Sequence, residues 1–242
     1  MRGDQSMFEA EKLRGILFDL HGTLIYVTEQ GEDRLRVGFE TLASAYSDIP
    51  FERFRDVWLA WREEPAIAAK RTAMQEVLFV DRVRLALERL EIEPKPDLIH
   101  AIAEAYVGVW EKATIIDEAD RQCLVGLKDR YKLGLITNFA YSPSIPRLLR
   151  KFDLEGIFDA VIVSAEIGWV KPHPLIFRCA MQALNCKPDE LIFVGDDLDA
   201  DIAGSETVGM TPVLVDAYNQ HKNAECMRIH CVAELPPILR KP

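Results

Sequence analysis

The sequence lacks an excess of positive charge. It holds 29 lysines and arginines against 39 aspartates and glutamates, which gives a formal net charge of -10. Proteins that bind nucleic acids or anionic membranes usually carry clustered basic residues, so this balance argues against both partners. A small anionic substrate remains compatible with it, because a local lysine or a bound metal ion can outweigh the charge of the whole chain.

Long hydrophobic runs and paired cysteines are missing as well. No apolar stretch approaches the roughly 20 residues that a membrane-spanning helix needs. The N-terminal stretch MRGDQSMFEAEK is polar and lacks the basic and apolar segments of a targeting signal. The five cysteines form no C-x-x-C pair, which fits a reducing compartment. We therefore expect a soluble, cytoplasmic protein.

The segment from about residue 28 to 113 has the periodicity of helices. Apolar residues recur three or four positions apart in four groups, which begin at Leu35, Phe51, Val83 and Ile99. Proline-containing breaks separate the groups. We predict four helices that pack on one another. Trp58 and Trp61 lie on one of these stripes, and we interpret them as bundle core, with the lining of a substrate pocket as the alternative.

Outside this segment, short apolar runs alternate with helix-like segments. The runs cover residues 15–19, 132–137, 159–164, 191–196 and 211–215, and the sequence RIHCVAEL indicates a further edge strand. Such alternation predicts an α/β fold with a Rossmann-like parallel sheet flanked by helices. We assign residues 1–26 and 117–242 to this core domain and residues 27–116 to an all-helical insertion.

Polar residues follow several of the predicted strands. They are Asp19, Thr137 with Asn138, Lys171, and Asp196 with Asp197. Ligands of parallel sheets bind beyond the carboxyl ends of the strands, so we expect these side chains to meet. Converging aspartates raise one another's pKa values, and a hard divalent cation such as Mg²⁺ relieves that repulsion. Together with a lysine and a hydroxyl group, such a site suits a phosphate.

Four sequence motifs carry a family resemblance. FDLHGTL, LITN, GWVKPHP and FVGDDLDADIAG resemble, in this order, the four motifs of the haloacid dehalogenase-like hydrolases. The helical segment lies where one class of these enzymes inserts a helical cap domain. The resemblance implies Mg²⁺-dependent hydrolysis of a small phosphorylated metabolite through an aspartyl-phosphate intermediate.

The resemblance also implies a role for each matching residue. Asp19 corresponds to the nucleophile, whose second oxygen binds Mg²⁺. Thr137 corresponds to the phosphate-binding hydroxyl group, with Asn138 contributing beside it, and Lys171 steadies the nucleophile and the phosphate. Asp196 corresponds to a metal ligand, as do Asp197 and Asp201, which act directly or through water. His21 would ligate the metal through its backbone carbonyl.

The residues just after the first strand carry expectations of their own. We expect Gly22 to permit the sharp turn at the end of this strand, and Thr23 to cap the next segment of the chain.

The side chain of His21 departs from the family pattern. Phosphatases of this family normally have a second aspartate there, which protonates the leaving oxygen and later activates water. A histidine can do both, so one hypothesis makes His21 the catalytic acid and base. A second is that the site binds phosphate compounds and turns them over slowly or not at all.

Two further reactions stay open. The family's metal-free dehalogenases also lack the second aspartate, although the acids of VGDD are not required for their chemistry. Phosphoryl transfer to a sugar, as in phosphomutases, is the other. The sequence is compatible with a monomer or a homodimer.

Overall fold

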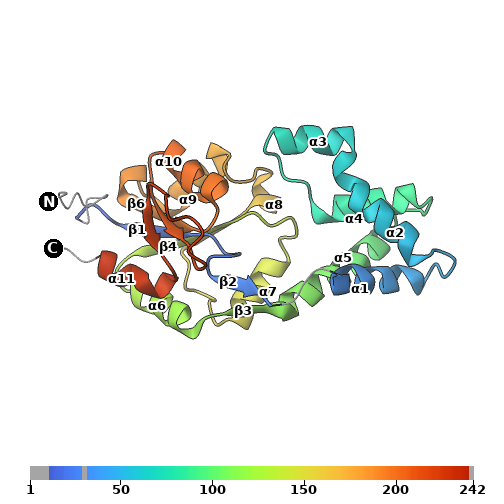
Figure 1. Cartoon of the computed structure of the whole chain (residues 1–242), viewed down its shortest axis with the longest axis horizontal. Coiled ribbons are helices and arrows are strands. Elements are labelled where there is room, and N and C mark those ends of the chain that lie inside the picture. Colours follow the sequence, from blue (N-terminus) through green and yellow to red (C-terminus); the bar gives the residue numbers. More distant parts are fainter. Residues whose placement is uncertain (1–10, 29–31, 240–242) are drawn as a thin grey trace.

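The computed structural model describes residues 11–28 and 32–239, so the polar stretch at 1–10 lies outside the described residues. A six-stranded sheet, in the order β5-β4-β1-β6-β7-β8, forms one half of the molecule (Figure 1). All neighbouring strands in it are parallel. The strands are β1 (Gly15–Phe18), β4 (Lys132–Thr137), β5 (Ala160–Val163), β6 (Leu191–Gly195), β7 (Thr211–Val215) and β8 (Met227–Ile229). The predicted α/β fold is confirmed, and only the first two residues of RIHCVAEL, Arg228 and Ile229, belong to the short edge strand β8.

Helices cover both faces of this sheet. Alternate side chains of β1 enter different clusters: Ile16 and Phe18 pack with α6 and α7, whereas Leu17 packs with α9. All three are fully buried, and burial of such a side chain contributes about 1.5–3 kcal/mol. The helices of this half are α6 (Glu118–Lys128), α7 (Ser144–Lys151), α8 (Ser164–Ile167), α9 (Pro174–Leu184), α10 (Gly204–Thr207) and α11 (Leu235–Ile238). A π-helix, η3 (Leu198–Ala203), follows β6, and two 3₁₀ turns complete the half, η2 (Pro188–Glu190) and η4 (Val232–Glu234).

The helical insertion contains five α-helices, where the sequence pattern predicts four. They are α1 (Glu32–Ala43), α2 (Phe51–Leu59), α3 (Pro65–Thr72), α4 (Phe79–Arg89) and α5 (Pro96–Ala113), with the 3₁₀ turn η1 (Ala60–Glu63). The additional helix, α3, begins at Pro65, which the sequence pattern indicates only as a break. Proline is well tolerated in the first turn of a helix. Because α3 buries no residue, it carries no apolar stripe that periodicity could reveal.

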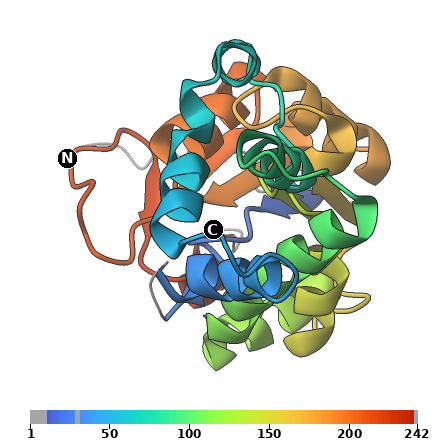
Figure 2. The ribbon, with the colours of Figure 1, turned by 90° about the vertical axis from the view of Figure 1, so that its right-hand side faces the viewer.

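The insertion has a hydrophobic core of its own, which includes Leu42, Phe54, Trp58 and Leu87. Trp58 is 2% exposed, which confirms it as core, whereas Trp61 is half-buried and lines a cavity. Seen from the insertion, the blue to green helices lie in front of the sheet (Figure 2). None of the helices in the described ranges is long and apolar enough to cross a bilayer.

A two-stranded antiparallel ribbon joins the insertion to the sheet half. Strand β2 (Ile25–Val27) pairs with β3 (Thr114–Ile116), with Ile25 opposite Ile116. The backbone N–H and the hydroxyl group of Thr28 both donate to the carbonyl of Ala113, at 2.9 and 2.8 Å. Neither strand is predicted from the sequence, because three residues are too few to show a period. The predicted borders of the insertion fall at this ribbon.

Candidate active site

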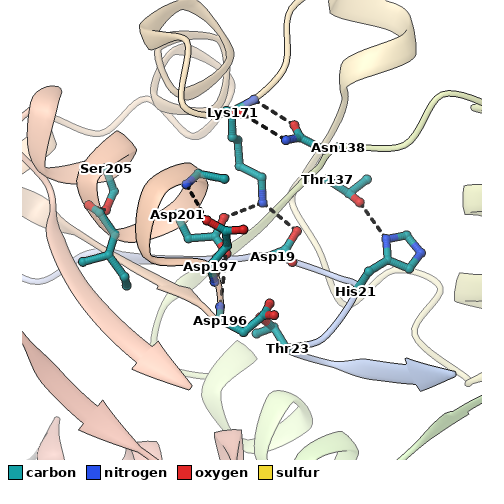
Figure 3. A network of polar contacts seen from close by, with 12 residues as sticks. Asp19, His21, Thr23, Thr137, Asn138, Lys171, Asp196, Asp197, Asp201 and Ser205 are labelled. Carbon is teal, nitrogen blue, oxygen red and sulfur yellow. Dashed lines mark hydrogen bonds and ion pairs between the residues drawn. The ribbon is translucent and has the colours of Figure 1, made fainter. Parts of the chain in front are cut away.

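The polar residues of the site come from the carboxyl ends of neighbouring parallel strands. Asp19 follows β1, Thr137 ends β4, and Asp196 follows β6. Since β1 pairs with both β4 and β6, these three ends lie side by side (Figure 3). Lys171 joins them from the loop between α8 and α9. Asp19, Lys171 and Asp196 help to line a mainly polar hollow of about 170 Å³, a size that suits a phosphate group, and Asn138 and Asp201 also line it.

Lys171 is the centre of the hydrogen-bond network. Its Nζ lies 2.6 Å from Oδ1 of Asp19 and 2.7 Å from Oδ1 of Asp201, and all three side chains are buried. Burial alone would lower the pKa of Lys171, but the two carboxylates outweigh burial and raise it. The lysine therefore stays charged, and the two carboxylates compensate the cost of burying its charge.

Asn138 positions the backbone of Lys171. Its Nδ2 donates to the Lys171 carbonyl at 3.0 Å, and its Oδ1 accepts the Lys171 N–H at 2.8 Å. From the sequence we expect Asn138 to contribute to phosphate binding beside Thr137. Both ends of its amide are bonded to Lys171, so this side chain holds the lysine loop against the end of β4 and leaves the backbone of Asn138 for the predicted phosphate contact.

Asp201 connects the lysine to the turn after β6. Its Oδ2 accepts the backbone N–H groups of Asp196 and Asp197, both at 3.1 Å, while Oδ1 faces Lys171. Burial raises the pKa of Asp201 to about 6, although the charge of Lys171 opposes the rise. A Cβ atom on Gly195 would come within 2.4 Å of the Asp201 carboxyl group, so this approach requires glycine.

Asp196 is held by the turn of the first motif. The Thr23 hydroxyl group donates to Oδ1 of Asp196 at 2.8 Å. Gly22 has a φ of +92°, and a Cβ there would lie 2.3 Å from Oδ2 of Asp196. Burial raises the pKa of Asp196, and the Thr23 bond opposes it. The sequence predicts that Thr23 caps the next segment of the chain. Its hydroxyl group instead binds Asp196, which belongs to the motif FVGDDLDADIAG.

The acids Asp19, Asp196 and Asp201 form a group that fits a divalent cation. Each offers one oxygen, and these oxygens lie within 4.8 Å of one another. Three carboxylates face one ammonium group, which leaves two negative charges unbalanced. Burial, ahead of any neighbouring charge, raises the pKa of all three. A hard divalent ion would balance the charges and find the oxygen ligands that it prefers.

Asp197, also predicted as a metal ligand, stands outside that group of three. Its Oδ1 accepts the N–H groups of Asp199 and Ala200, both at 2.8 Å, and so caps the π-helix η3. The carboxylate is exposed at the rim of the polar hollow.

His21 lies at one side of the hollow, in an aromatic cluster. Its Nδ1 is 3.1 Å from the Thr137 hydroxyl oxygen, and its ring centre lies 4.8 Å from that of Phe139 and 4.6 Å from that of Trp110. Its Nε2 is buried and has no hydrogen-bond partner among the described residues. Burial, and then the charge of Lys171, lowers the pKa of His21 to about 3, so the imidazole is neutral at physiological pH.

Trp110 lies against His21, although it is the last residue of the apolar group that begins at Ile99, which the sequence pattern assigns to the helical bundle. It belongs to α5 of the insertion, and it also stacks on Phe139 with ring centres 4.9 Å apart. Because Phe139 follows β4, this pair connects the insertion to the site. From the sequence alone, a tryptophan on an apolar helical stripe cannot be assigned to the active site rather than to the core of the helical bundle.

Comparisons with known proteins agree on the family and the fold. Residues 13–209 match the family described as haloacid dehalogenase-like hydrolase. The chain is 38% identical over 205 residues to a glyceraldehyde 3-phosphate phosphatase of Pyrococcus furiosus, covering 84% of this chain and 80% of that protein. It is 29% identical over 203 residues to a ribulose-1,5-bisphosphate 5-phosphatase of Halopiger xanaduensis, covering 83% and 84%.

The solved structures include a 2-haloacid dehalogenase from Pseudomonas syringae pv. Tomato, with a TM-score of 0.68. The match covers 94% of this chain and 98% of that one at 20% sequence identity, so it supports the fold alone.

Proposed function

The chain belongs to the haloacid dehalogenase-like hydrolases and is a phosphatase of that family, and we propose that it cleaves the phosphate ester of a small, sugar-like metabolite through an aspartyl-phosphate on Asp19. The observation that carries this proposal is the position of Asp19. Its carboxylate is bonded to Lys171, grouped with Asp196 and Asp201, and opens into a polar hollow of phosphate size.

The first step is attack by Asp19. A carboxylate oxygen forms a bond to phosphorus, the bond to the ester oxygen breaks, and the leaving oxygen takes up a proton from water. Burial raises the pKa of Asp19, so the nucleophile depends on nearby positive charge to stay ionised, and Lys171 supplies part of it. Lys171 and the Thr137 hydroxyl group would hold the phosphate oxygens. In the second step water attacks the phosphorus, which releases phosphate and restores Asp19.

The metal requirement follows from the same acids. Asp19 and Asp196, together with Asp201, would hold Mg²⁺, and the His21 carbonyl is a further ligand by the family pattern. Bound there, the ion would supply positive charge to the phosphoryl oxygens. Asp201 shares its Oδ1 with Lys171, so it also fixes the lysine that contacts the nucleophile.

His21 acts as a neutral group in this mechanism. Its Nδ1 is engaged by Thr137 and its ring is packed against Phe139 and Trp110, so it positions the phosphate-binding hydroxyl group. It supplies no readily released proton to the leaving oxygen. Turnover should therefore be faster for esters whose alcohol leaves easily, such as aryl phosphates, than for alkyl phosphates. The same observation favours a second candidate function, binding of a phosphorylated ligand with little turnover.

The test compares the wild-type chain with Asp19→Asn. We expect Mg²⁺-dependent phosphate release from p-nitrophenyl phosphate and from glyceraldehyde 3-phosphate, and a loss of more than about 10³-fold in the variant. Equal release by both chains would sink the proposal. Tight binding of the sugar phosphate without release would support the second candidate, and chelator-resistant chloride release from 2-chloropropionate would indicate dehalogenation.

A further inference from the structure

A second cavity lies between the insertion and the sheet half, beside the loops of the active site. It has a volume of about 270 Å³, and its lining includes Arg71, Glu76 and Arg82 of the insertion and Val170 of the core. Val170 directly precedes Lys171, so the cavity adjoins the loop that carries the lysine. The backbone N–H of Val170 donates to the Met74 carbonyl at 2.9 Å, which joins this loop to the insertion.

Arg82 brings a largely unpartnered cation into this cavity. Its guanidinium carbon lies 4.1 Å from the ring centre of Trp58 and 4.8 Å from that of Trp61. One N–H donor reaches the Trp58 carbonyl at 3.4 Å, and the buried Nε has no acceptor. No carboxylate in the described ranges forms an ion pair with it. A largely buried charge without a counter-ion is costly, and its position in a cavity makes Arg82 a candidate ligand-binding group.

Among the arginines of α4, only the one that faces the cavity lacks an acidic partner in the described part of the chain. Arg84 pairs with Asp81 at 2.6 Å, and Arg89 pairs with Glu64. Both lie on the outer surface of α4, where acidic partners are plentiful in a chain with a net charge of -10. Arg82 alone among these three faces the cavity, and it is the one without an acidic partner.

The remaining charged groups at the cavity leave room for an anion. Arg71 lines the cavity, and the guanidinium group of Arg62 lies 5.5 Å from the ring centre of Trp61, so positive charge accumulates there. Glu76 is the one acid among the lining residues. Its carboxyl group is bonded to the Ser164 hydroxyl group and to the Val77 N–H rather than to Arg82.

We propose that Arg82, assisted by Arg71, binds a second small anionic group, a carboxylate or a phosphate, in the cavity beside the active site. This anion arrives either as the far end of the phosphorylated substrate or as a separate small molecule. The first case rests on the proposed function, because the other end of that substrate reaches Asp19. Binding of a separate small anion does not depend on the proposed function.

The kinetic test uses two substrates that differ only in a distal charge. 3-Phosphoglycerate carries a carboxylate where glycerol 3-phosphate carries a hydroxymethyl group. Where the anion is the far end of the substrate, we expect Arg82→Met to raise KM for 3-phosphoglycerate by about 10- to 100-fold, with kcat and the constants for glycerol 3-phosphate unchanged. Arg84→Met, on the outer face of the same helix, should change neither. Equal losses on both substrates would contradict a distal anion site.

A binding test separates this proposal from the proposed function. In the Asp19→Asn background we would follow tryptophan fluorescence, since Trp58 and Trp61 flank Arg82. If this chain binds 3-phosphoglycerate more tightly than glycerol 3-phosphate, and Arg82→Met abolishes that preference, the anion is the far end of the substrate. This result stands even if no hydrolysis is ever seen. Binding of malonate alone, lost in Arg82→Met, supports the separate-anion case. If Arg82→Met alters the binding of none of the three probes, the proposal is wrong.

A stability measurement shows whether Arg82→Met acts through misfolding. Methionine keeps the apolar stem against Trp58 and removes an unpaired charge, so we expect the melting temperature to stay equal or to rise. A fall together with loss of all ligand binding would identify a structural role and overturn the assignment.

Discussion

His21 occupies the position at which the family's phosphatases carry an aspartate, and its surroundings lead to a prediction on catalysis. We expect His21→Asp to raise kcat/KM for glycerol 3-phosphate by about 10²-fold or more, because it introduces a carboxylic acid that can protonate the leaving oxygen. The gain for p-nitrophenyl phosphate should be much smaller, since its leaving group needs little protonation. The measurement is the increase in kcat/KM for glycerol 3-phosphate divided by the increase for p-nitrophenyl phosphate. A slower variant on the alkyl ester would mean that His21 is itself the working acid.

Asp120 gives a prediction on the pH dependence of stability. It is 1% exposed, its Oδ1 accepts the Ala233 N–H at 2.7 Å, and its Oδ2 has no partner among the described residues. Burial raises its pKa above the ordinary value of 3.8. A raised carboxyl pKa contributes stability that is present below 3.8 and is lost as the pH rises through the raised value.

The variant Asp120→Asn removes that pH dependence and keeps the acceptor for Ala233. Relative to the wild type, its free energy of unfolding should rise on the order of 1 kcal/mol between pH 4 and pH 7. Denaturant unfolding at several pH values measures this. Asp129→Asn, an exposed change at the end of the same helix, serves as the control. A constant difference across the pH range would show that Asp120 is ionised at no cost.

The sequence predicted the main site residues better than their individual partners. Asp19, Thr137 and Asp196 meet because parallel strands end at one edge, which an apolar run followed by a polar residue reveals. Lys171 joins them from the loop between α8 and α9. The hydrogen bonds from Thr23 to Asp196 and between Asn138 and Lys171 join segments that are far apart in the chain. The sequence does not predict them, because the distances between these segments are set only by the folded backbone. Trp110 was missed because a buried stripe does not say which of its residues lies at an interface.

At the scale of elements, the turn after β1 depends on Gly22. In Gly22→Ala, the new Cβ would meet the Asp196 carboxylate and the φ of +92° would be strained, so we expect a loss of about 1–3 kcal/mol and weaker Mg²⁺ binding. Denaturant unfolding and Mg²⁺ titration measure the two effects.

Gly156→Ala is the matched control for that turn. Gly156 also has a positive φ, of +76°, but nothing lies within 4 Å of its Cβ position. It should lose stability by strain alone and keep its Mg²⁺ affinity. If both variants bind Mg²⁺ as the wild type does, Asp196 does not depend on this turn.

The sequence patterns predict the buried strands of the sheet but not the short or exposed elements. The five apolar runs all became strands of the sheet, because strands buried on both faces read as continuous apolar sequence. Helix α3 and the ribbon of β2 and β3 went undetected, because the helix buries nothing and the strands are three residues long. An element reveals itself in the sequence only to the extent that it buries a face over at least one or two periods.

At the scale of the whole molecule, the insertion is held over the site by bonds to two core loops. The Glu76 N–H donates to the Gly168 carbonyl at 2.9 Å, and the Phe79 N–H donates to the Ala140 carbonyl at 3.0 Å. The buried Ser164 hydroxyl group joins the same segments, because it accepts the Phe139 N–H at 2.8 Å and donates to Glu76. These bonds must break if the insertion is to swing away from the site.

We therefore predict that Ser164→Ala loosens this contact. It leaves Oε2 of Glu76 and the Phe139 N–H without hydrogen-bond partners, which should lower the free energy of unfolding by about 1–3 kcal/mol. Amide hydrogen exchange in segment 74–79 should become faster than in the wild type, while exchange in β1 changes little. Ser44→Ala, an exposed serine of the insertion, is the control. Unchanged exchange in segment 74–79 would show that Ser164 does not hold the insertion closed.

The ribbon of β2 and β3 has a consequence for how this architecture can change. Because Val27 and Thr114 are paired neighbours, the insertion enters and leaves the sheet half at a single point. A segment of any length can be spliced between two such adjacent ends without altering the distance that the chain must span, since the cost of closing a longer loop grows only slowly. The catalytic half can thus keep its geometry while the covering half is exchanged, and new substrate preferences become accessible by grafting.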